Sequence, residues 1–127
     1  MKHIVLVDDV HVSSYANLVL LQRLYTQLEH RRWAKERRLF LINELNKNGA
    51  LTCHYCHRPN LKLKSAKRRE QATVDHVIAK SVGGDAFCHS NFVVACNSCN
   101  QRKASQSALD FIESEYIKKK RQTNGHA

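Results

Sequence analysis

Two pairs of cysteines, each separated by two residues, constrain this chain more than any other feature. The first pair is Cys53 and Cys56, and the second is Cys96 and Cys99. Cysteine thiolates at this spacing are typical zinc ligands, and four of them complete a tetrahedral site. Such a site leaves no coordination position for water, so it is structural rather than catalytic. We therefore expect the cysteines to join two distant segments, and any chemistry to come from residues between and after them.

The composition indicates a folded domain with a polyanionic partner. The chain has 127 residues, and 43% of them are hydrophobic, which is enough for one core and argues against general disorder. The formal net charge is +10, and the sequence pI is near 9.7. A charge of this sign favours nucleic acid as the partner. A merely basic protein, for example one associated with the ribosome, is the alternative.

The use of cysteine favours metal binding in a reducing compartment. The chain has five cysteines, an odd number, and Cys88 is left over after the two pairs. Secreted disulfide scaffolds usually contain even numbers of cysteines without such tight pairing. The apolar run near Met1 is too short for a secretory signal, and no stretch is long enough to span a membrane. We expect a soluble, cytoplasmic protein.

Residues 1–49 are predicted to form a short strand followed by a basic helical arm. Ile4–Val7 is apolar and β-branched, as in a strand. A helical pattern follows, with Ser13 or Ser14 as a candidate cap and Asn48-Gly49 as a stop signal. The pattern rests on apolar residues three or four positions apart, namely Leu18, Leu21, Tyr25 and Leu28, and Leu39 and Ile42 resume the same phase later.

The charged segment Arg31–Arg38, which contains Trp33, interrupts this apolar stripe. The arm is therefore either one long helix with a solvated middle or two helices. A coiled coil would rest on interrupted heptads. A homodimer or a larger assembly formed through the arm is a further hypothesis.

Residues 50–127 are predicted to form a second domain that carries both cysteine pairs. Thr73–Ala79 and Phe92–Ala95 have the β-branched composition of strands, and Gly83-Gly84 is a turn signal. A helix capped by Asn97 or Ser98 is expected to follow. A second helix is expected over Ala108–Lys120, with a basic end and frayed residues from Gln122 to Ala127.

The order of motifs in this region resembles the HNH endonuclease family, in its zinc-stabilised form. The residues that carry the resemblance, over about residues 50–112, are Cys53 and Cys56, then Asp75-His76, Gly83-Gly84 and Asn91, and finally Cys96, Cys99, Asn100 and Lys103. The fold implied is α+β, a small ββα-metal (His-Me finger) unit. The strand, strand and helix predicted above match this order independently.

The resemblance implies a role for each motif residue in hydrolysing a DNA phosphodiester. His76 would be the general base that takes a proton from water. Asn91 would hold the imidazole in its tautomer and orientation. Asp75 and Asn100 would bind one divalent cation, Mg²⁺ or Mn²⁺, which stabilises the charge of the leaving group.

The third motif position departs from the commoner family pattern, because it holds Asn100 rather than histidine. We interpret this as a His-Asn-Asn variant. A carboxamide oxygen is a hard ligand that suits Mg²⁺ or Mn²⁺, whereas losing the imidazole weakens the preference for softer metals.

Basic residues near these motifs are candidates for phosphate contacts. Lys103 and Arg102 follow Asn100, and the arm segment Arg31–Arg38 adds further charge. A third cluster precedes the predicted strand Thr73–Ala79 and comprises Lys62, Lys64, Lys67, Arg68 and Arg69. Such clusters favour binding through phosphates, with low sequence specificity and strong salt dependence.

Two other functions compete with a DNA endonuclease. The cysteine pairs could form a non-catalytic zinc knuckle that binds DNA or, less favoured, RNA. Alternatively, the nuclease unit could act only within a larger phage or mobile-element assembly. Three histidines near the cysteines, His54, His57 and His89, are treated as bystanders because the four thiolates already fill a zinc site.

Overall fold

The computed structural model describes the backbone of residues 7–124 and the side chains of residues 14–124. Its elements are, in order, helix α1 (Val7–Asn48), η2 (Arg68–Glu70), strand β1 (Ala72–His76), η3 (Lys80–Val82), η4 (His89–Asn91), strand β2 (Phe92–Cys96), and helices α2 (Asn97–Lys103) and α3 (Ala108–Asn124). The η elements are single 3₁₀ turns. This mixture of helices with one small sheet confirms the predicted α+β class and ββα unit.

The chain divides into two compact units, Met1–Lys35 and Glu36–Ala127. The division falls within α1, whereas the sequence suggested a boundary at residue 49. The last turns of α1 belong to the second unit because Phe40 and Leu41 are buried in its core. The ring of Phe40 packs edge-on against Phe92 of β2, with a centroid distance of 5.5 Å. Burial of these apolar side chains stabilises the unit.

The arm forms one long helix, α1, rather than two helices. It already includes Val7, Ser13 and Ser14, so neither serine caps it, and the predicted strand is wrong at Val7. The remainder of that strand lies outside the described residues. The predicted stop is confirmed: Gly49 has φ +76° and donates its N–H to the Leu45 carbonyl at 2.8 Å. Among the described residues, no helix combines the length and apolar character that a membrane span requires.

Strands β1 and β2 form an antiparallel hairpin in which Ala72 lies opposite Cys96 and His76 lies opposite Phe92. The first strand was predicted to continue to Ala79, but it ends at His76. The Val77 N–H still donates to the carbonyl of Asn91, its partner in the same register, at 2.9 Å, and the Asn91 side chain then bonds the Ile78 backbone. The hairpin therefore places the Asp75-His76 motif at the end of β1.

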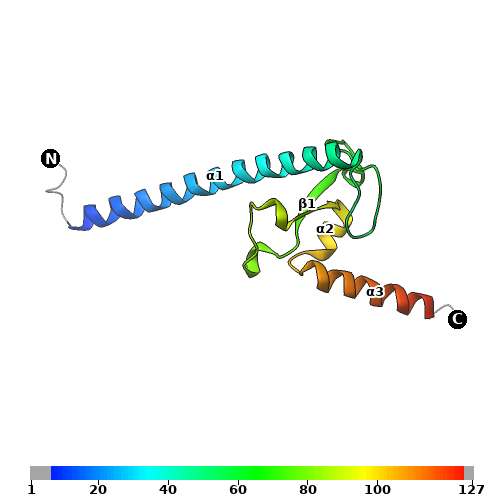
Figure 1. Cartoon of the computed structure of the whole chain (residues 1–127). Coiled ribbons are helices and arrows are strands. Elements are labelled where there is room, and N and C mark those ends of the chain that lie inside the picture. Colours follow the sequence, from blue (N-terminus) through cyan, green and yellow to red (C-terminus); the bar gives the residue numbers. More distant parts are fainter. Residues whose placement is uncertain (1–6, 125–127) are drawn as a thin grey trace. The chain divides into compact units, whose positions relative to one another are not determined.

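Helices α2 and α3 complete the second unit, where α2 lies beside the hairpin (Figure 1). The predicted cap of α2 was Asn97 or Ser98, but the residue at this position is Cys96, whose sulfur accepts the Cys99 N–H at 3.4 Å. Helix α3 extends to Asn124 and packs through the buried ring of Phe111, 5.1 Å from the Tyr55 ring. The first turn of the metal-ligand helix is thus stabilised by a cysteine.

Ala104 joins α2 to α3 in a conformation that is rare for an L-amino acid. Its φ is +49° and its ψ is −123°, outside the right- and left-handed helical regions. Its N–H donates to the Asn100 carbonyl at 3.2 Å, which ends α2 directly after Lys103. Glycine adopts such dihedral angles without steric strain. This residue therefore stores backbone strain beside the candidate site.

Replacing Ala104 with glycine should stabilise the protein. The strain at such a residue costs on the order of 1–3 kcal/mol, whereas the added chain entropy of glycine costs about 0.4–1 kcal/mol. We expect Ala104→Gly to raise the free energy of unfolding by about 1 kcal/mol in urea titrations. The exposed helical residue Gln101 is the matched control, because Gln101→Gly should destabilise. An Ala104→Gly protein that is less stable than the wild type would show that the backbone at Ala104 is not strained.

Candidate active site and metal centre

The structure brings the four paired cysteines together. The sulfur atoms of Cys53, Cys56, Cys96 and Cys99 all lie within 4.8 Å of one another. Cys56 and Cys96, which come from different pairs, are 3.7 Å apart. Four sulfurs at about 2.3 Å from a tetrahedral ion would be about 3.8 Å from one another. The cluster is therefore positioned to bind a metal ion.

The surroundings of this cluster shift the pKa values of its thiols in different directions. Burial raises the pKa of Cys99, and the Arg102 guanidinium, which donates to its sulfur at 3.2 Å, opposes that effect. At Cys53, burial also acts to raise the pKa, but backbone N–H groups, chiefly that of Cys56, lower it overall. Arg102 was predicted to contact phosphate. In the structure it contacts the Cys99 sulfur and lies 3.6 Å from the Glu115 carboxylate, while its side chain stays half exposed, so the phosphate contact stays a prediction.

The two residues of the Asp75-His76 motif lie on opposite faces of the hairpin, because successive side chains of a strand alternate. Thr73 and Asp75 share the face that meets α2, where Asn100 Nδ2 donates to the Thr73 hydroxyl at 3.1 Å. His76 lies on the other face, with its ring 5.3 Å from Phe92. The structure thus places Asp75 and Asn100 on one face, apart from the imidazole.

Asp75 is the most enclosed acid of the site, with 7% of its surface exposed. Its Oδ2 atom accepts a hydrogen bond from the Tyr55 hydroxyl at 2.6 Å and lies 3.0 Å from the Lys103 ammonium. Burial, together with the neighbouring Asp75 carboxylate, raises the pKa of Tyr55 well above its usual range. The phenol therefore keeps its proton and donates it to this bond.

Lys103 was predicted to contact phosphate, and the structure corrects this prediction. The residue is 0% exposed, and its ammonium donates to the His76 carbonyl at 2.9 Å as well as pairing with Asp75. A buried ammonium needs such partners, because desolvation of an unpaired charge is costly. Lys103 therefore acts inside the protein, where DNA cannot reach it.

The imidazole of His76 is held by the backbone of the loop that follows β1. Its Nε2 atom lies 3.1 Å from the Ala86 carbonyl oxygen. A carbonyl can only accept, so Nε2 carries the proton and Nδ1 has the lone pair in the neutral ring. Nδ1 is thus the basic atom of this histidine.

The side chain of Asn91 fixes this loop. Its Oδ1 accepts the Ile78 N–H at 2.9 Å, and its Nδ2 donates to the carbonyls of Ile78 and Asp85 at 3.0 and 2.9 Å. Gly84 is required within the loop, because a Cβ atom there would lie 1.8 Å from the Ile78 oxygen. Asn91 was predicted to hold the imidazole. Its hydrogen bonds support that role indirectly, through the backbone that presents the Ala86 carbonyl.

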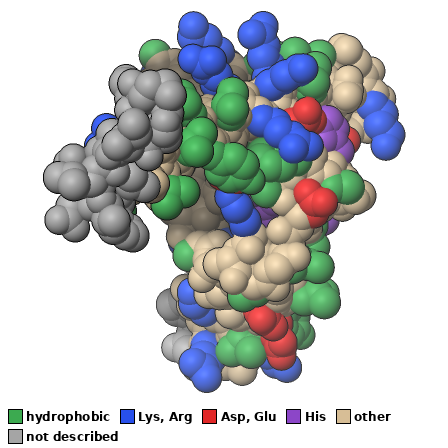
Figure 2. Space-filling view, turned by 90° about the vertical axis from the view of Figure 1, so that its left-hand side faces the viewer, with side chains coloured by type: hydrophobic (Ala, Val, Ile, Leu, Met, Phe, Trp, Pro, Cys, Tyr) green, Lys and Arg blue, Asp and Glu red, His purple; other side chains and the backbone are tan. Residues whose placement is uncertain are grey.

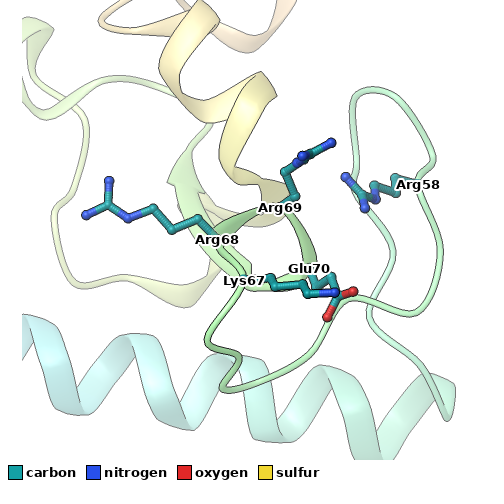
Figure 3. Close-up of a pocket in the computed structure, with 5 residues that line it drawn as sticks. All are labelled: Arg58, Lys67, Arg68, Arg69 and Glu70. Atoms are coloured by element: carbon teal, nitrogen blue, oxygen red, sulfur yellow. The ribbon is translucent and has the colours of Figure 1, made fainter.

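A basic pocket of about 550 Å³ lies between the loop after the first cysteine pair and η2. It is lined by Arg58, Lys67, Arg68, Arg69 and Glu70. Arg58 and Arg69 point toward one another across it, whereas Arg68 points away (Figure 3). Glu70 is the acid of this lining, and Lys62 pairs with it at 3.2 Å and lowers its pKa. The pocket therefore has an excess of positive charge and suits an anion such as phosphate.

Lys and Arg side chains also recur over the wider surface, with few acidic side chains between them in the face shown in Figure 2. This distribution agrees with the formal net charge of +10. Charge spread in this way attracts a polyanion without requiring particular bases.

Sequence reasoning missed three groups of the site: Tyr55, Thr73 and the Ala86 carbonyl. Tyr55 could have been noticed, since it lies between Cys53 and Cys56. The carbonyl has no sequence signal, because every residue carries one. The burial of Lys103 could also have been predicted from the sequence, since Lys103 follows Cys99 by one helical turn and shares its buried face.

Comparison with known proteins identifies one family. Residues 53–106 match the family model of the HNH endonuclease, a segment that contains both cysteine pairs, the hairpin and α2. The match covers less than half of the chain. No curated protein and no solved structure matches it.

We expect the purified protein to hold one metal ion per chain at the four cysteines. Cys96→Ser should remove that ion and lower the melting temperature by on the order of 10 °C or more, because a structural metal contributes several kcal/mol to folding. Cys88→Ser is the matched control, since Cys88 is exposed and lies outside the cluster. Elemental analysis and thermal melts measure both effects. A folded, metal-free wild-type protein would refute the site.

Proposed function

Because residues 53–106 match the HNH endonuclease family, we propose that this chain hydrolyses phosphodiester bonds of DNA with the help of a divalent cation. The observation that carries the proposal is the tautomer and position of the His76 imidazole. Its Nε2 is held by the Ala86 carbonyl at the end of β1, and its Nδ1 is the basic atom. A neutral imidazole with a fixed ring is suited to remove a proton from water.

In this proposal, His76 Nδ1 accepts the proton of the water that attacks phosphorus. Asn91 and Gly84 contribute by fixing the loop that orients the ring. The flanking Phe92 ring limits the rotation of the imidazole. A base that is already oriented lowers the entropic part of the barrier.

Asp75 and Asn100 are the proposed ligands of the catalytic cation. A carboxylate and a carboxamide supply hard oxygen atoms, which fit Mg²⁺ or Mn²⁺. Asp75 lies on the face of the hairpin that meets α2, and Asn100 of α2 contacts that face at Thr73. A cation bound there would stabilise negative charge on the phosphate and the leaving oxygen.

We assign zinc to the four cysteines. Four thiolates at tetrahedral spacing suit zinc better than the harder divalent ions. The proposed zinc has a structural role, since its four ligands leave no open position. It joins the segment before the hairpin to the helix after it.

DNA is the proposed substrate, bound mainly through its phosphates. The support is the basic pocket around Arg58 and Arg69 and the overall positive charge. We expect low sequence preference and steep salt dependence. A non-catalytic module that binds DNA or RNA is the alternative, and a cleavage assay separates the two.

The arm favours a second proposal, that the nuclease unit works as a homodimer or in a larger assembly. Several apolar residues of α1 are exposed at heptad spacing, among them Leu18, Leu21, Tyr25 and Leu28, each at 60% or more of its surface. An apolar stripe of this kind suits a partner helix. One active site per chain would nick duplex DNA, whereas a dimer could cut both strands. This proposal stays a prediction.

His76→Ala should abolish cleavage of plasmid DNA. The substitution removes the base, and general-base catalysis contributes about 10²–10⁴-fold to the rate of typical enzymes. The measurement is a time course on supercoiled plasmid with Mg²⁺, Mn²⁺ or EDTA, following the nicked and linear forms. The metal content of the cysteine cluster and DNA affinity should stay nearly unchanged.

His30→Ala is the matched control, because His30 is an exposed histidine of α1 outside the nuclease domain. It should cut at the wild-type rate. A purified His76→Ala protein that also cuts at that rate would refute the general-base assignment, and the binding-module alternative would then be favoured.

Removing the facing arginines should weaken DNA binding and flatten its salt dependence. The variant Arg58→Ala with Arg69→Ala removes two candidate phosphate ligands, so the slope of log K against log salt should fall by about one for each phosphate that is no longer neutralised. The control, Lys120→Ala with Arg121→Ala, removes the same charge from the end of α3. Fluorescence anisotropy with a labelled duplex measures both. Equal slopes for the two variants would rule out a special role of the pocket.

A further inference from the structure

We propose that Lys103 and Tyr55 are positioning residues of the active site, which orient Asp75 and limit the affinity of the site for its divalent cation. This inference rests on the proposed function, because it concerns the carboxylate assigned to that cation. It goes beyond the assignment of ligands, since neither residue would touch the cation or the substrate.

The geometry concentrates two donors on one oxygen of Asp75. The Tyr55 hydroxyl and the Lys103 ammonium contact Oδ2 at 2.6 and 3.0 Å, and Oδ1 takes part in neither contact. Because Lys103 also donates to the His76 carbonyl, it ties the carboxylate to the backbone of the next residue. The two bonds fix the carboxylate plane and orient Oδ1 as the oxygen that remains for a cation.

The charge of Lys103 opposes cation binding at the same carboxylate. In a buried pair the ammonium neutralises most of the field of Asp75, and it repels a second cation nearby. Screening by water is weak here, because Lys103 is 0% exposed and Asp75 is 7% exposed. Lys103 therefore gives the site an oriented ligand and lowers its cation affinity.

Both positioning residues come from the segments that carry the cysteine cluster. Tyr55 lies between Cys53 and Cys56, and Lys103 follows Cys99 by one turn on the buried face of α2. A metal that holds the four sulfurs together thus also holds the two donors at the Oδ2 atom of Asp75. The arrangement couples the structural metal centre to the catalytic carboxylate.

A purely structural ion pair would make a different prediction. If Lys103 only stabilised the fold, its removal would reduce stability without strengthening cation binding. If it sets cation affinity, its removal leaves the carboxylate negatively charged and tightens binding. Mn²⁺ affinity and stability therefore move in opposite directions under the proposal, which a structural role does not produce.

The test compares Lys103→Met and Tyr55→Phe with the wild-type protein, each with the cysteine cluster loaded with zinc. Mn²⁺ binding is followed by electron paramagnetic resonance, and plasmid cleavage is followed against Mn²⁺ concentration. Thiolates bind Mn²⁺ weakly, so the cluster should not interfere. Lys120→Met is the matched control for net charge, because Lys120 is an exposed residue of α3.

We expect Lys103→Met to bind Mn²⁺ on the order of tenfold more tightly, because a repelling charge is removed. Its maximal cleavage rate should fall by about tenfold, because the carboxylate is no longer held. Tyr55→Phe removes a neutral bond and keeps the ion pair. It should change Mn²⁺ affinity by no more than about twofold and still lower the maximal rate.

If the folded Lys103→Met protein binds Mn²⁺ with unchanged or weaker affinity, the claim that Lys103 limits the cation affinity of the site is refuted. Since a buried, unpaired Asp75 can prevent folding, Tyr55→Phe tests the positioning role alone, and a wild-type maximal rate there overturns it. A wild-type protein that never cuts DNA refutes the proposed function. The Mn²⁺ affinities would still decide whether Lys103 controls cation binding.

Discussion

The fold of the second unit depends on one constraint, the meeting of four cysteines from two distant segments. The two pairs come from segments on either side of the hairpin, yet their sulfurs lie within 4.8 Å of one another. The sheet has only two strands of five residues, and such a hairpin is marginal without further packing. A metal ion bound by both pairs would supply the crosslink that this small core needs. The same cluster brings Tyr55 and Lys103 of α2 to the same oxygen of Asp75.

The hairpin also separates the carboxylate and the imidazole of the Asp75-His76 motif. Alternation along β1 directs Asp75 toward α2 and His76 toward Phe92 and the Ala86 carbonyl. An acid and a base in direct contact would form an ion pair and lose the lone pair of the imidazole. Opposite faces keep His76 from pairing with its neighbour, and the backbone carbonyl sets its tautomer without adding a full charge.

The sequence predicted the parts of this architecture that depend on local chemistry. The cysteine pairs predicted the sulfur cluster, and β-branched runs located both strands, with errors of three residues at the end of β1 and one at each of the other misplaced ends. Predictions were less accurate where the end of an element depends on tertiary contacts. Beyond His76, the backbone of Ile78 bonds the side chain of Asn91 rather than a partner strand, and no local sequence pattern encodes that contact. The cap of α2 was missed because a metal-ligand cysteine replaces the usual polar residue.

The error at Lys103 shows why charge alone is a poor guide to function. A lysine beside a family motif is normally expected on the surface, because burying an ammonium is costly. Here two acceptors, the Asp75 carboxylate and the His76 carbonyl, offset that cost within hydrogen-bond distance. Burial then changes the role of the residue: a cation that would have contacted DNA instead acts on the protein's own carboxylate. Arg58 and Arg69, in contrast, remain exposed beside Glu70, an acid that is already paired with Lys62.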